Sequence, residues 1–163
     1  MTEETQEEAF SRGMVVVAHA DDAEYGCSGT VAKWCAEGWE VVYVMCTDGS
    51  KGSSDREMAQ KELLRIRRQE QTNAGKVLGL KDVAFLDHED GMLVPTLELR
   101  RDIAREIRRY RPDVVICQLP IRVLDGEWRV SHPDHMAAGE ATLAAVFPSA
   151  RDHLTFPELL EAG

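Results

Sequence analysis

The sequence predicts an α/β fold of the Rossmann-like, doubly wound kind, with a mostly parallel sheet and helices on both faces. Four short runs rich in valine are separated by longer helical stretches, and none of the runs alternates cleanly with polar residues. Strands that are buried on both faces have this continuous apolar character. Strands joined through helices are parallel, because each crossover returns the chain to the same end of the sheet.

Strands and helices alternate along the chain. The predicted strands are residues 14–18, 41–46, 83–86 and 113–119. The predicted helices are residues 28–37, 55–78, 97–110 and 134–147. Gly38, Gly79 and Pro112 lie where the first three helices have to end, and Pro133 suits the first turn of the fourth. The arginines of helix 97–110 are expected to form a solvated face; they are Arg100, Arg101, Arg105, Arg108 and Arg109.

Length and charge narrow the class of protein. The 163 residues fit one domain, and we expect a mobile acidic arm at 1–12 followed by a single α/β domain at 13–163. The net charge of −10 repels a phosphate backbone, so we expect no nucleic-acid partner. No stretch resembles a membrane span, and the first residues lack the features of a signal peptide. We therefore expect a cytoplasmic protein with no membrane partner.

Polar side chains follow every predicted strand. The first strand is followed by HADD (19–22), the second by TDG (47–49), the third by DHEDG (87–91) and the fourth by SHPDH (131–135). Ligands bind beyond the carboxyl ends of the strands in open parallel sheets, so these loops are where we expect the functional site. Every histidine except His153 lies in one of them.

His19, Asp22 and His135 form a predicted metal site. His19 and Asp22 leave one strand three residues apart, and His135 comes from another loop at the same edge. Three such ligands with an open fourth position are typical of catalytic zinc, which acidifies its bound water. Fe²⁺ can use the same ligands. Because neighbouring side chains diverge, one of Asp21 and Asp22 can bind the metal while the other acts as general base.

Other signals in these loops are weaker. Gly26 and Gly29 precede a helix, but the full GxGxxG motif of a dinucleotide site is missing, so we interpret them as allowing a tight turn. His88 and His153 are left without a role. Trp128 lies just before SHPDH, where it can stack on a sugar ring or simply pack.

At these residues the chain resembles the LmbE-like, or PIG-L, family of zinc-dependent N-deacetylases. The resemblance covers about residues 14–147, and its two signatures are AHADDAEYG (18–26) and SHPDH (131–135). It implies zinc on His19, Asp22 and His135, with Asp21 as general base and His132 as the cation that faces the developing oxyanion. The implied reaction is hydrolysis of the acetyl amide of an N-acetylglucosamine-type small molecule by metal-activated water.

Further matches to the family suggest how the substrate is held. Arg67 and Asp90 are the expected contacts for sugar hydroxyls, with Asp48 as a third, and we expect Asp134 to support the metal ligands without binding the metal. Ala20 stands where the family usually has proline, which leaves every functional side chain in place. Family members generally continue past the last predicted helix, so we expect the domain to lack a C-terminal segment that shapes the pocket. The resemblance also suggests a homo-oligomer, a trimer or hexamer.

Two other functions stay open on the sequence. A metal-dependent phosphoester hydrolase would need two metals or a basic phosphate clamp, and neither is evident from the loops. A non-catalytic sugar-binding module would not need an acid–base pair beside a metal.

Overall fold

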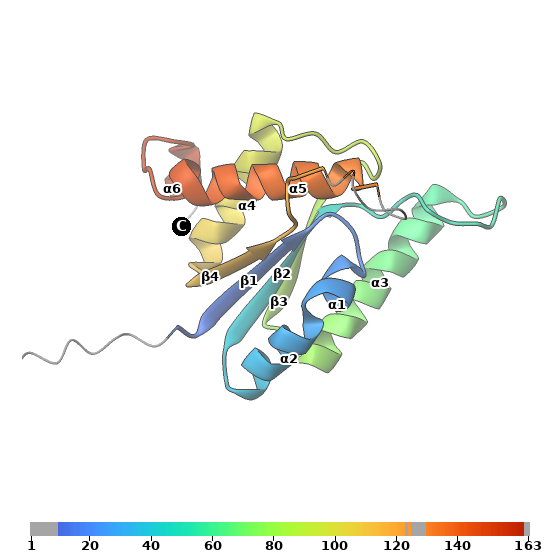
Figure 1. Cartoon of the computed structure of the whole chain (residues 1–163), viewed down its shortest axis with the longest axis horizontal. Helices are drawn as coiled ribbons and strands as arrows, with labels where there is room; N and C mark the ends of the chain where they lie inside the picture. Colours follow the sequence, from blue (N-terminus) through green and yellow to red (C-terminus); the bar gives the residue numbers. More distant parts are fainter. Residues whose placement is uncertain (1–9, 123, 125–129, 162–163) are drawn as a thin grey trace, which may run out of the picture.

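The predicted α/β class is confirmed by the computed structural model, which describes residues 10–122, 124 and 130–161. Within these residues β1 (Arg12–Val17), β2 (Glu40–Thr47), β3 (Asp82–His88) and β4 (Val114–Cys117) form one parallel sheet in the order β3-β2-β1-β4. The chain moves outward from β1 to β3 and then returns to place β4 on the other side of β1 (Figure 1). This reversal creates a topological switch point between β1 and β4. Trp128 and residues 1–9 of the expected acidic arm lie outside the described residues.

Helices cover both faces of the sheet, as predicted (Figure 1). On one face lie α1 (Asp22–Gly26), α2 (Ser28–Ala36) and α3 (Gln60–Leu78). On the other lie α4 (Leu97–Tyr110) and α5 (Pro133–Ala144), followed by η1 (Ala145–Ser149) and α6 (Glu158–Glu161). None of the described helices has the length and apolar character that crossing a bilayer requires.

Strand β1 explains why the apolar runs do not alternate. Met14 and Val16 pack into the core on the side of α4 and α5, whereas Val15 and Val17 pack into the core on the side of α1 and α2. Successive side chains of a strand point to opposite faces, so a strand that is covered on both sides needs apolar residues at every position.

Two predicted helix boundaries are wrong. The helix expected from residue 55 begins only at Gln60, because the Asp55 carboxylate accepts the Glu57 N–H and holds a turn there. The helix expected to reach residue 147 ends at Ala144 and passes into η1. Phe147 in η1 has an extended backbone, and Pro148 has no N–H with which to continue a helix.

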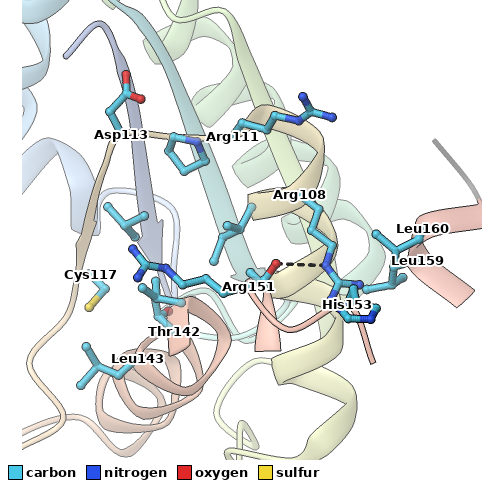
Figure 2. A pocket seen from close by; sticks show the side chains of 15 residues that line it. Arg108, Arg111, Asp113, Cys117, Thr142, Leu143, Arg151, His153, Leu159 and Leu160 are labelled. Atoms are coloured by element: carbon cyan, nitrogen blue, oxygen red, sulfur yellow. Dashed lines mark hydrogen bonds between the residues drawn. The ribbon is translucent and has the colours of Figure 1, made fainter. Parts of the chain in front are cut away.

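The prediction of a solvated arginine face on α4 is wrong for Arg108. This half-buried side chain points from α4 toward the turn that carries His153 (Figure 2). Its guanidinium donates to five backbone carbonyls, those of Ser149, Ala150, Asp152, Thr155 and Phe156. Arg108 therefore fastens the segment after α5 to α4.

Candidate metal and catalytic site

Three predicted ligands converge where β1 ends and α5 begins. The Nδ1 atom of His19 lies 3.2 Å from Nε2 of His135 and 3.4 Å from Oδ2 of Asp22, and Nε2 of His135 lies 3.1 Å from Oδ1 of Asp22. Ligands about 2.0–2.1 Å from a tetrahedral zinc ion stand about 3.3–3.4 Å from one another. The spacing of the three groups thus fits a single ion of this size.

The first turn of α5 places two histidines beside each other. Pro133 opens the helix, and His132 caps it by accepting the Asp134 N–H at Nδ1, 3.2 Å away. Ser131, the residue before this cap, donates its hydroxyl to the Ile121 carbonyl. The rings of His132 and His135 have centroids 5.1 Å apart, which brings His132 alongside the three convergent groups.

Two carboxylates stand behind His19. Its Nε2 atom lies 3.1 Å from Oδ1 of Asp90 and 3.1 Å from Oδ2 of Asp134. The fully buried Asp134 also accepts the N–H groups of Gly91 (2.7 Å) and Leu93 (3.2 Å), so both of its oxygens already have partners. Metal-bound histidines usually donate their other ring N–H to a carboxylate. This arrangement orients His19 with Nδ1 toward Asp22 and His135.

The charges around His19 favour a cation. Burial lowers the pKa of His19, but hydrogen bonds and charge from Asp22, with contributions from Asp134 and Asp90, outweigh it and raise that pKa to about 9. Burial raises the pKa of Asp22, but hydrogen bonds from His135 and His19 hold it well below its usual range. The carboxylates therefore favour positive charge in the space between them, either as protons on the histidines or as a metal ion.

Asp21 and Asp22 point in different directions. The side chain of Asp21 is 69% exposed and accepts a 2.8 Å hydrogen bond from Nη2 of Arg67. The same nitrogen donates to the Ala20 carbonyl, and the other terminal nitrogen of Arg67 contacts Glu70. Arg67, a predicted substrate contact, therefore lies against the predicted base at the rim of the site.

Two cavities meet at Asp21 and His132. The first, of about 640 Å³, is called the polar cavity because its lining includes the polar or charged side chains of His19, Asp21, Arg67, Asp90 and His132. The second, of about 960 Å³, is lined by Tyr25, Leu119, Ile121 and Val130 together with Asp21, His132 and His135. One cavity with charged side chains and one with more apolar side chains thus lie beside His19, Asp22 and His135.

Asp48 is the one predicted substrate contact that lines neither cavity. Its Oδ1 atom accepts the N–H groups of Ser50 (2.9 Å) and Asp90 (3.2 Å). Oδ2 of Asp90 in turn accepts the Lys51 N–H at 3.0 Å. These bonds tie the loop after β2 to the loop after β3, so Asp48 shapes the site from a distance.

The two unassigned histidines lie elsewhere. Nε2 of His88 contacts Oδ2 of Asp102 on α4 at 3.2 Å. His153 lines a separate cavity of about 680 Å³ between α4, β4 and α5, which contains none of the predicted site residues (Figure 2).

Sequence reasoning missed Gln71, a buried residue of α3 that contacts the loop carrying Asp21. Gln71 lies one turn after Arg67 and one turn before Gly75, on the side of α3 that is turned inward. A glutamine in the inward stripe of a helix is a polar group that needs partners when it is buried. That signal was present in the sequence, but the partner could not be read from it.

Comparison with known proteins bears on this arrangement. A family model described as PIG-L, GlcNAc-PI de-N-acetylase, matches residues 14–146. The diacetylchitobiose deacetylase of Thermococcus kodakarensis is 36% identical over 133 residues, covering 82% of this chain and 48% of that protein. The mycothiol S-conjugate amidase of Streptomyces coelicolor is 30% identical over 168 residues, covering 90% of this chain and 55% of that protein. A solved structure, the N,N'-diacetylchitobiose deacetylase from Pyrococcus horikoshii, superposes with a TM-score of 0.86 at 30% identity, covering 94% of this chain and 55% of that one.

The chain spans about half the length of the relatives it matches. The matched range 14–146 nevertheless contains β2, β3, β4, all of β1 except its first two residues, and the three convergent residues His19, Asp22 and His135. With a family model over most of the chain and a relative at 36% identity, the chain belongs to the PIG-L family.

Proposed function

We propose that this chain carries the catalytic site of a metal-dependent deacetylase that hydrolyses the acetyl amide of an N-acetylglucosamine-type small molecule. The observation that carries the proposal is the convergence of His19, Asp22 and His135 at spacings of 3.1–3.4 Å, with Asp21 and His132 beside them. Relatives named as deacetylases of N-acetylated sugars support the substrate class. We further propose that residues 13–163 act as a single α/β domain.

His19, Asp22 and His135 are the groups that would hold the ion. Nitrogen and carboxylate ligands in this number suit Zn²⁺, and Fe²⁺ is the alternative with the same ligand preference. A cation bound there supplies a Lewis acid for the acetamide carbonyl and lowers the pKa of a water molecule to about 7. Asp134 and Asp90 fix the direction of the His19 ring from behind.

The remaining chemistry falls to side chains at the rim. Asp21 lines both cavities, and its exposed carboxylate would accept a proton from the attacking water and return it to the departing amine. Its contact with Arg67 holds it at this rim. His132 borders both cavities, where its Nε2–H would donate a hydrogen bond to the negative oxygen of the tetrahedral intermediate while Nδ1 accepts the Asp134 N–H.

The polar cavity is the proposed place for the sugar. Arg67 and Asp90 line it, and we propose them as a donor and an acceptor for hydroxyl groups in addition to the contacts that they make within the protein. We assign Asp48 a supporting role, because it lines neither cavity and its Oδ1 atom accepts two backbone N–H groups.

A phosphoester hydrolase has less support. One arginine and one lysine line the polar cavity within the described part of the chain, and both already face carboxylates: Arg67 contacts Asp21 and Glu70, and Lys51 contacts Glu89. A phosphate clamp would need cations that are available to the ligand.

Acetate release tests the proposal directly. Zinc-loaded protein is incubated with N-acetylglucosamine and with N,N'-diacetylchitobiose, and acetate and free amine are measured together with the metal content. We expect about one zinc per chain and release of both products, with loss of activity on chelation. Folded, metal-loaded protein that releases acetate from neither compound would contradict the proposal, as would full activity in protein stripped of metal.

A further inference from the structure

Gln71 on α3 has an unusual environment for a glutamine. Its side chain is only 2% exposed, and both ends of its amide have partners on the loop between β1 and α2. Nε2 donates to Oε1 of Glu24 at 2.8 Å, and Oε1 accepts the backbone N–H of Asp21 at 3.3 Å. One buried amide thus joins α3 to the segment that carries Asp21 and Asp22.

The backbone of Asp21 is what this amide holds. Asp21 has a φ of 84°, in the left-handed region that non-glycine residues seldom occupy and that the surrounding structure has to maintain. Arg67, one turn before Gln71 on α3, binds the Asp21 carboxylate and the Ala20 carbonyl. Helix α3 therefore contacts this residue at two points, with Arg67 at the side chain and Gln71 at the backbone.

The chemistry of the amide explains why a glutamine suits this place. The Asp21 N–H needs an acceptor and the Glu24 carboxylate needs a donor, and a neutral amide offers both from one side chain. An aliphatic residue would remove the partner of both groups in a partly buried environment.

We propose that Gln71 is a positioning residue for Asp21, fixing the backbone from which the proposed general base reaches the reacting water. The inference rests on the proposed function only for its effect on catalysis; the contact between Gln71 and the Asp21 loop does not depend on the reaction. Displacement of a catalytic group by about 1 Å can cost roughly 100-fold in rate. Metal binding should be spared, because Gln71 touches none of His19, Asp22 and His135 by its hydrogen bonds.

The test compares Gln71→Met with Gln69→Met. Gln69 is an exposed glutamine of the same helix whose amide donates to Asn73, so it controls for the change of residue type. We expect Gln71→Met to keep its zinc and its KM, to lose about 10- to 100-fold in kcat, and to show roughly tenfold faster NMR-detected hydrogen exchange at the Asp21 amide. Gln69→Met should match the unaltered protein in all four measurements.

Two further variants separate positioning from loss of structure. In the double variant Gln71→Glu with Glu24→Gln, amide and carboxylate trade places, so both hydrogen bonds can form again and most of kcat and exchange protection should return. Adding Gln71→Met to Asp21→Asn should slow the enzyme little further, because both act through one group.

Normal exchange at Asp21 together with normal kcat in Gln71→Met would overturn the inference, and so would fully additive losses with Asp21→Asn. If the unaltered protein releases no acetate, the proposed function fails, while the exchange measurement still decides whether Gln71 holds the Asp21 backbone. If Gln71→Met does not fold, the double variant Gln71→Glu with Glu24→Gln provides the test. A folded double variant in which the Asp21 amide exchanges without protection would overturn the inference.

Discussion

Asp21 and Asp22 are chemically identical neighbours with different surroundings. Asp22 faces His19 and His135, whereas Asp21 is exposed and bound to Arg67. We expect Asp22→Ala to lose most of its zinc and to recover part of its activity in excess zinc, because the change removes a proposed ligand. Asp21→Asn should keep its zinc and lose about 10²- to 10⁴-fold in kcat, the usual contribution of a general base. Zinc content and kcat are measured on the same preparations.

The two variants serve as controls for each other. Loss of zinc from Asp21→Asn with retention in Asp22→Ala would reverse the assigned roles. Near-normal kcat in zinc-loaded Asp21→Asn would place the base elsewhere.

His132 should resemble Asp21 in its response. Its Nδ1 atom accepts a backbone N–H as the cap of α5, so the ring can reach the reaction only through its other edge. We expect His132→Ala to retain zinc and to lose about 10²- to 10³-fold in kcat, as when an oxyanion donor is removed. His132→Asn, which can still cap the helix, separates the two roles of the side chain. Retained kcat in His132→Asn and loss in His132→Ala would show that the cap alone matters.

At the scale of single residues, the sequence predicts which side chains form the candidate site better than it predicts the contacts between them. His19, Asp22 and His135 were identifiable because each follows a strand end or opens a helix at the same edge of the sheet. The contact of Gln71 with Asp21 was not predictable, because it depends on a left-handed backbone at a residue that is not glycine.

At the scale of elements, the position of α5 depends on Gly139. A Cβ atom there would overlap the carbonyl oxygen of Gln118 and lie 3.0 Å from its carbonyl carbon, both backbone atoms. We expect Gly139→Ala to destabilise the fold by about 1–3 kcal/mol, as overpacked sites do, even though alanine favours helices. Because His135 is one turn earlier on α5, zinc affinity should fall as well.

Gly29→Ala in α2 is the matched control. A Cβ atom at Gly29 would meet no atom within 4 Å, so its urea midpoint should stay equal or rise slightly. Equal midpoints for the two variants would show that α5 can move away from Gln118 without cost.

Arg108 should control the segment that follows α5. Its planar guanidinium meets five carbonyls spread over residues 149–156, which the single ammonium of lysine cannot reach together. We expect Arg108→Lys to lower the free energy of unfolding by about 1–3 kcal/mol and to speed amide exchange in this segment first. Arg109→Lys, at an exposed position on the same helix, should stay within about 0.5 kcal/mol. Unchanged exchange in Arg108→Lys would contradict the role assigned to the guanidinium.

Elements that are buried on both sides were the most predictable. Each of the four strands begins within two residues of the first residue predicted for it, because burial on both faces fixes the composition of such strands. The start of α3 and the end of α5 were misjudged, since a turn held by Asp55 and the local effect of Pro148 decided them.

For the whole molecule, the position of the candidate site depends on the return of the chain from β3 to β4. That reversal brings the loop after β1 and the first turn of α5 together at the switch point, with the loop after β3 behind them. The strand order of a doubly wound sheet thus predicts where a site lies, whereas the side chains of the loops determine its chemistry.

An ion at this point would link distant parts of the chain. His19 and His135 are 116 residues apart in sequence, and Asp22 belongs to a different helix from His135. An ion that binds only the folded state stabilises it by about 2.7 kcal/mol when its free concentration is 100 times Kd. For a domain of this size that corresponds to a rise in Tm of roughly 5–10 °C. We therefore expect Tm to fall by this amount on chelation and to recover on adding zinc.

The same variants locate the effect of the ion. Zinc should raise the Tm of Asp21→Asn as much as that of the unaltered protein, because this change leaves His19, Asp22 and His135 intact. Asp22→Ala should show little or no rise at the same zinc concentration. A rise of equal size in Asp22→Ala would mean that zinc binds elsewhere on the chain, and no rise in any of the three proteins would mean that these side chains do not share an ion.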